Sequence, residues 1–127
     1  MSLRSELGRV KGLGSAKQGL GHWRVQRLTA VALVPLALWF VTALMSLIGA
    51  PHAAVVAWIS QPHITVLMLA LVIALFWHLQ LGLQTVLEDY VHAPWLQIIT
   101  QLGVRGFAVL GALAAIVSIL KISVGVN

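Results

Sequence analysis

The chain has 127 residues, of which 60% are hydrophobic and only 9% are charged, a balance that excludes an ordinary soluble domain and predicts a bilayer protein. The formal net charge is +5, but most positive residues lie at one end of the chain, so the charge does not indicate a protein that binds nucleic acid. Cysteine is absent, which excludes disulfides and metal sites built from thiolates.

The N-terminal residues 1–27 are basic and rich in glycine, and we predict that they form a cytoplasmic tail. Each glycine disfavours a regular helix by about 1 kcal/mol relative to Ala. Such a tail would either be attracted to anionic lipid headgroups or dock as a strap on a peripheral protein. The segment holds six of the eight Lys and Arg residues, namely Arg4, Arg9, Lys11, Lys17, Arg24 and Arg27.

Three long apolar runs follow and predict an all-α membrane anchor over residues 28–127. The predicted transmembrane helices cover residues 28–48, 64–87 and 98–120. About 20 residues at a rise of 1.5 Å each cross a hydrocarbon core of ~30 Å. Only helices satisfy all backbone hydrogen bonds within such a segment. The first run exceeds the ~7–15 residues of a signal-peptide core, so we expect a retained span.

The distribution of basic residues predicts the orientation of these spans. The connection between the first and second spans, residues 49–63, contains no Lys or Arg. By the positive-inside rule the N-terminus lies in the cytoplasm, and three crossings place the C-terminus in the periplasm. We therefore predict a multi-pass protein of the bacterial inner membrane.

Small residues on the third predicted span indicate close helix packing. Gly111 and Ala115 are four residues apart, as are Ala108 and Ala112. This spacing lets helix backbones approach closely in membranes. It carries no information about catalysis.

His78 is an ionisable residue deep within the second span, where such residues are costly and usually have a function or a partner. A neutral imidazole can offer one nitrogen to a metal while the other donates a hydrogen bond. Gly82, one turn away, leaves space for a flat macrocycle or for another helix. The alternative is a histidine that hydrogen-bonds across the helix bundle.

A haem with two histidine ligands would need a second histidine facing His78. His63 is on the same helix, fifteen residues and about 22 Å away along its axis, so it cannot bind the same iron. The other histidines, His22, His52 and His92, lie outside the spans. If His78 holds a haem, we expect the second ligand from another polypeptide.

Asp89 and Tyr90 follow the second apolar run directly. A phenol can donate a hydrogen bond to a carbonyl oxygen, and a carboxylate can relay or attract protons. The pair suits a quinone at the membrane edge, although acidic residues and tyrosines also commonly mark a helix end. Arg27 and His22 lie on the same side and suit an anionic group such as a haem propionate, but a lipid phosphate or a simple topology signal would also explain Arg27, and His22 has the same alternatives.

Taken together, these residues resemble a known family. The two stretches that carry the likeness are His22-Trp23-Arg24-Val25-Gln26-Arg27-Leu28-Thr29-Ala30 and His78-x3-Gly82-x-Gln84-x-Val86-x2-Asp89-Tyr90. The pattern resembles the small hydrophobic membrane anchors of succinate dehydrogenase, respiratory Complex II, in their alphaproteobacterial form. The likeness covers residues from about 15 to 95, and the third span matches only in type.

The resemblance implies a non-catalytic anchor of a succinate:ubiquinone oxidoreductase, with haem b shared with a second, companion anchor protein of the same complex. His78 would be an axial ligand of the haem iron, and Arg27 would approach the propionates, with His22 as a more weakly transferred second propionate residue. Tyr90 would hydrogen-bond ubiquinone, and Asp89 would lie close to it.

The remaining partners implied by the resemblance are an iron–sulfur subunit, which passes electrons to the quinone, and a flavoprotein subunit, where succinate is oxidised. Membrane lipids complete the surroundings. No role follows for His52, His63 or His92. The alternatives are the anchor of another haem-b quinone oxidoreductase such as fumarate reductase, or a non-redox transport or assembly protein with His78 in a proton path.

Overall fold

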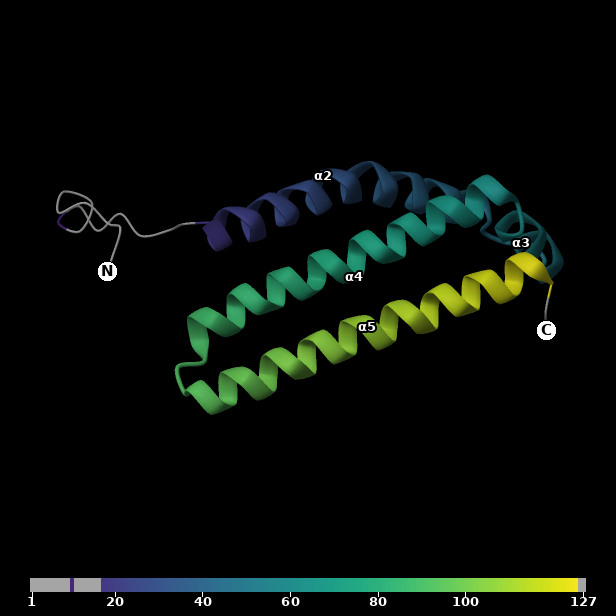
Figure 1. Ribbon diagram of the computed structural model, residues 1–127. Coiled ribbons are helices and arrows are strands. Elements are labelled where there is room, and N and C mark those ends of the chain that lie inside the picture. Colours follow the sequence, from purple (N-terminus) through teal and green to yellow (C-terminus); the bar gives the residue numbers. More distant parts are fainter. Residues whose placement is uncertain (1–9, 11–16, 126–127) are drawn as a thin grey trace.

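The computed structural model describes Val10 and residues 17–125 and places four helices in this part of the chain. They are α2 (Lys17–Ser46), α3 (His52–Ile59), α4 (Pro62–Tyr90) and α5 (Pro94–Val124). The three long helices form an open layer with α4 in the middle (Figure 1). Within the described residues the backbone of α4 lies close to those of both α2 and α5, whereas the backbones of α2 and α5 do not approach each other. We call the two ends of this layer the Tyr90 end and the Ser60 end.

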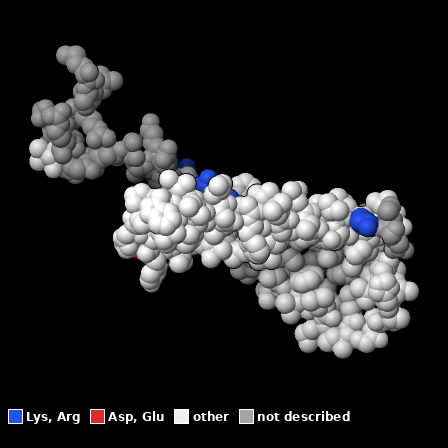
Figure 2. All heavy atoms as spheres, turned by 90° about the horizontal axis from the view of Figure 1, so that it is seen from below, with Lys and Arg blue, Asp and Glu red and all other residues white. Residues whose placement is uncertain are grey.

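The predicted all-α membrane fold with three spans is confirmed. The helical segments long and apolar enough to cross a bilayer are Leu20–Ser46, Pro62–Tyr90 and Pro94–Val124. On the face shown in Figure 2, the charged atoms of the described residues lie toward the two ends of the layer, and the surface between them carries none. This distribution matches a protein whose middle lies in hydrocarbon.

The first long helix begins earlier than the apolar run alone predicts. Residues 17–27, which the sequence assigns to the tail, are helical and continuous with the span. Helix stability in proteins comes mainly from packing, and His22, Val25 and Gln26 are each half-buried. Packing therefore outweighs the cost of the glycines in these turns. The rest of the predicted tail, except Val10, lies outside the described residues.

The Ser60 end is closed by a short helix and by hydroxyl hydrogen bonds. Helix α3 occupies the predicted 49–63 connection, and its Trp58 stacks on Trp39 of α2 with ring centroids 6.1 Å apart. The Ser60 hydroxyl donates to the Ile122 carbonyl over 3.2 Å, and the buried Thr65 hydroxyl lies 3.0 Å from the hydroxyl of Ser123. These contacts join α3, α4 and α5 in one corner.

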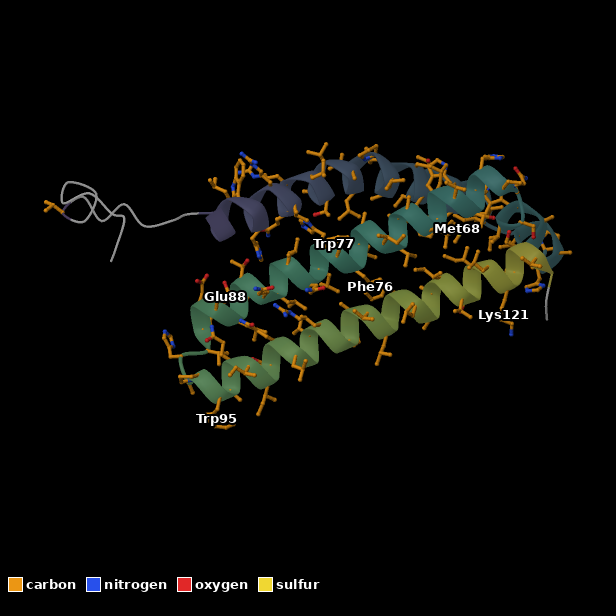
Figure 3. The ribbon with its side chains drawn as sticks, viewed as in Figure 1. Met68, Phe76, Trp77, Glu88, Trp95 and Lys121 are labelled. Atoms are coloured by element: carbon orange, nitrogen blue, oxygen red, sulfur yellow. The ribbon has the colours of Figure 1, made fainter. Side chains whose placement is uncertain are left out.

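Gly111 of α5 lies directly against the Phe76 ring of α4. The Phe76 ring projects from α4 into the space between these two helices (Figure 3). A Cβ atom on Gly111 would lie 2.6 Å from Cε1 of that ring, well inside van der Waals contact. The packing of this aromatic ring therefore favours a residue without a side chain at position 111.

We predict that Gly111→Ala destabilises the protein by about 1–3 kcal/mol, because the added methyl group overpacks the Phe76 contact. Unfolding of the detergent-purified protein, followed by its helical circular dichroism, measures the effect. Gly106→Ala on the same helix is the matched control, since its Cβ would meet nothing within 4 Å. Phe76→Leu should partly restore the stability of the Gly111→Ala protein. Equal stability of the two alanine variants would contradict the proposed contact.

Candidate functional site

His78 lies on the side of α4 that faces α2, and it is half-buried. Its Nδ1 atom is 3.0 Å from Oγ1 of Thr29, a residue 49 positions away in the chain. The same Thr29 oxygen lies 3.0 Å from the carbonyl oxygens of both Val25 and Gln26. Within the described residues, this is the side-chain hydrogen bond that joins α2 to α4.

The depth of the two residues explains why they meet. Thr29 is the twelfth residue after the first residue of α2, and His78 is the twelfth before the last residue of α4. At 1.5 Å per residue, each lies about 18 Å from its helix terminus at the Tyr90 end. Because the helices are antiparallel neighbours, the two side chains are level.

The other imidazole nitrogen of His78 is open. No described residue forms a hydrogen bond with Nε2, whereas Nδ1 is held by Thr29. The described residues contain no group of three or more His, Cys, Asp or Glu side chains able to hold a metal ion. The site therefore fits a cofactor that takes a single ligand from this chain, and it does not fit a metal site built from the described residues alone.

His22 lies seven residues before Thr29, two helical turns away on the same face of α2. It is half-buried, and its Nε2 atom is enclosed without a hydrogen-bond partner among the described residues. An enclosed polar atom left unpaired costs about 1–3 kcal/mol. The position therefore suits a polar or anionic group contributed from outside this part of the chain.

Arg27 is exposed and lies on a different face of α2. Two residues correspond to about 200° around a helix, so Arg27 points away from the side that carries Thr29. Its guanidinium carbon is 5.1 Å from the centroid of the Trp23 ring. Such an exposed cation–π contact is worth about 0.5–1 kcal/mol, which a stronger anionic partner would readily replace. The structure does not bring Arg27 into contact with His78.

Asp89 and Tyr90 form the last turn of α4. Both are exposed, and Tyr90 is 80% exposed. Asp89 comes eleven residues after His78, about 17 Å along the axis, and returns to the same face of the helix. Glu88 accepts a 2.9 Å hydrogen bond from the amide of Gln84, so it is already engaged. Asp89 and Tyr90 make no side-chain hydrogen bond with any described residue and are open to a ligand.

Thr29 is the residue that the sequence did not predict as part of the site. It stands within the Arg27-Leu28-Thr29-Ala30 stretch, but the resemblance gives it no role. The signal in the sequence that could have found Thr29 was a hydroxyl inside an apolar helix.

A separate apolar hollow of about 160 Å³ lies between α4 and α5, and none of the predicted site residues lines it. The lining residues are Ile73, Phe76, Trp77, Gln80, Ala108, Val109 and Ala112.

Comparisons with known proteins agree with the resemblance. A profile of the family described as succinate dehydrogenase/fumarate reductase transmembrane subunit matches residues 1–120. A succinate dehydrogenase hydrophobic membrane anchor subunit from Rickettsia bellii is 32% identical over 116 residues, covering 91% of this chain and 93% of that protein. The protein of the same description from Rickettsia conorii is 29% identical, covering 69% of this chain and 71% of that protein.

A more distant relative is the succinate dehydrogenase membrane anchor subunit of Reclinomonas americana. It is 27% identical over 96 residues, covering 73% of this chain and 80% of that protein. No solved structure matches the chain.

The prediction of the family, including its alphaproteobacterial character, is confirmed by the Rickettsia relatives. Together with the three apolar spans, these relatives also agree with a multi-pass protein of the bacterial inner membrane.

Proposed function

The chain belongs to the succinate dehydrogenase/fumarate reductase transmembrane-subunit family, and we propose that it is a succinate dehydrogenase anchor that helps to bind haem b and forms part of the quinone-reduction site. The observation that carries the proposal is the hydrogen bonding of the two ring nitrogens of His78. Its Nδ1 is held by Thr29 within a membrane span, and its Nε2 is open. An imidazole in this state is arranged as a metal ligand.

The roles around the cofactor follow from the open polar groups. His78 would hold the haem iron through its Nε2 lone pair, and a second ligand would come from the companion anchor protein. When bound, haem b stores and releases one electron. The enclosed Nε2 of His22 and the exposed guanidinium of Arg27 are available to hydrogen-bond the propionates.

The quinone role rests on the last turn of α4. The Tyr90 phenol donates a hydrogen bond to a carbonyl oxygen of ubiquinone, and the Asp89 carboxylate next to it attracts protons to the reduced quinone. Both side chains are exposed at a membrane-spanning helix end, where a lipid-dissolved substrate can reach them.

The proposed partners are those that the family implies, and we expect no activity from this chain alone. With the N-terminus predicted in the cytoplasm, the Tyr90 end faces the iron–sulfur subunit, which delivers electrons from the flavoprotein. The companion anchor protein and membrane lipids would cover the faces of the open layer.

The runner-up is an anchor of fumarate reductase, because the description of the matching family covers both enzymes. The names of the relatives favour succinate dehydrogenase. Co-purification with a flavoprotein and an iron–sulfur protein, followed by assays of succinate oxidation with quinone and of fumarate reduction with quinol, distinguishes the two. Faster fumarate reduction would favour the runner-up.

We predict that His78→Leu abolishes or strongly perturbs haem binding, because it removes the only ligand that this chain is proposed to supply. The reduced-minus-oxidised absorption spectrum of the purified complex measures the effect. His63→Leu is the matched control, since His63 is an exposed histidine on the same helix at the Ser60 end. A normal haem spectrum in the His78→Leu complex would rule out ligation by this residue.

We also predict that Tyr90→Phe slows quinone reduction about tenfold or more, which corresponds to the loss of one hydrogen bond of ~1.4 kcal/mol in the transition state. Succinate-dependent ubiquinone reduction by the purified complex measures the effect. Succinate oxidation with a soluble artificial acceptor serves as the control, because that reaction bypasses the quinone site. Equal losses in the two assays would show that the substitution acts on assembly and not on the quinone.

A further inference from the structure

We infer that Thr29 is a positioning residue for His78: its hydroxyl accepts the Nδ1–H of the imidazole and thereby presents Nε2 as the metal-binding nitrogen. The inference rests on the proposed function, in which His78 is the haem ligand of this chain. It concerns a residue outside the coordination sphere, which acts on the cofactor only through His78.

The count of hydrogens around the Thr29 oxygen decides the direction of the bond. Three groups lie 3.0 Å from Oγ1: the carbonyls of Val25 and Gln26, and Nδ1 of His78. A hydroxyl has one hydrogen to donate and two lone pairs to accept with. The carbonyls can only accept, so the hydroxyl hydrogen directed at them leaves its lone pairs for a donor. An Nδ1–H group on His78 is such a donor, and all three groups around Oγ1 then share a hydrogen bond with the Thr29 hydroxyl.

The opposite arrangement makes fewer hydrogen bonds. If the hydroxyl hydrogen pointed at Nδ1, Thr29 would lose its bonds to both carbonyls and its lone pairs would face no donor among the described residues. The hydrogen of the imidazole would then sit on Nε2, where it would block a metal. Polar atoms in hydrocarbon favour the arrangement that satisfies more of them. That arrangement is also the one that leaves Nε2 free.

The acceptor is itself held in place. Thr is β-branched, and a helical Thr that bonds to the carbonyls three and four residues earlier has a restricted χ1 angle. The Thr29 oxygen is therefore fixed relative to the backbone of α2, and it fixes the imidazole plane in turn. An acceptor on the far nitrogen also increases the basicity of the coordinating nitrogen, and loss of such a partner typically weakens metal binding ~10–100-fold.

Helix α2 contains a natural comparison for this arrangement. Thr42 bonds to the carbonyls of Leu38 and Trp39 over 3.0 and 2.8 Å, as Thr29 does to its own preceding turn. Thr42 is exposed, however, and forms no hydrogen bond with a side chain of another helix among the described residues. Replacing Thr42 therefore reproduces the local effect on the helix without any effect on His78.

The test compares Thr29→Val, Thr29→Ser and Thr42→Val in the detergent-purified complex with its haem. The readouts are haem content, the midpoint potential of the haem, and the electron paramagnetic resonance g-values of its oxidised form.

Valine keeps the shape of threonine and removes the hydroxyl oxygen that accepts the hydrogen bond. We expect Thr29→Val to shift the midpoint potential upward, because a less basic imidazole stabilises ferric haem less, and to weaken haem binding by about tenfold or more. Thr29→Ser and Thr42→Val should remain close to the native protein.

Thr29→Ala provides a second test if the valine variant does not assemble, because alanine removes the hydroxyl without adding bulk. A shift with alanine and none with serine supports the inference, and native potentials and g-values in all Thr29 variants overturn it. His78→Leu, measured in parallel, distinguishes a failure of the Thr29 inference from a failure of the proposed function. If His78→Leu loses its haem while Thr29→Val or Thr29→Ala behaves like the native protein, only the role of Thr29 is overturned. An intact haem spectrum in His78→Leu overturns the proposed function as well.

Discussion

The hydrogen bond between Thr29 and His78 is the side-chain hydrogen bond that joins α2 to α4 among the described residues, and the proposed site is built on it. In hydrocarbon an imidazole needs partners for its polar atoms, because no water is available to supply them. One partner comes from α2, which sets the relative depth of the two helices. The second nitrogen forms no hydrogen bond with a described residue, and under the proposed function it is the atom that would bind the haem iron.

Helix α4 carries both proposed chemical functions, and it is also the central helix of the layer. Its neighbours hold it on two sides through different interactions: a polar bond to α2 at His78, and the packing of Phe76 on Gly111 of α5. At the Ser60 end, hydroxyl bonds and the Trp39–Trp58 stack close the structure. The Tyr90 end has few such contacts among the described residues. The structure is thus closed at the end away from the proposed chemistry and open at the end where partners and quinone are expected.

The sequence was sufficient to predict the three spans, because length and hydropathy alone determine what can cross a bilayer. It also singled out His78 as unusual. It did not predict the Thr29–His78 bond, since starting the first helix at residue 28 placed Thr29 at the membrane surface, far from the depth of His78. The helical residues 17–27 and the short helix α3 depend on packing between segments, which hydropathy does not report. The roles of His78, His22, Arg27, Asp89 and Tyr90 all remain predictions, because they concern groups that other molecules must supply.

The open layer has a consequence for how the protein recognises its neighbours. Lipid tails are as apolar as leucine, so an uncovered apolar helix face in a membrane gains no hydrophobic free energy from a protein partner and depends on close packing and polar contacts to bind one. Besides packing, the groups that would distinguish a correct neighbour from a lipid are the open polar atoms, such as Nε2 of His78 and the enclosed Nε2 of His22. Selectivity in the assembly of the complex would then depend on filling these positions, and cofactor insertion would act as a checkpoint that separates a finished complex from an orphan anchor.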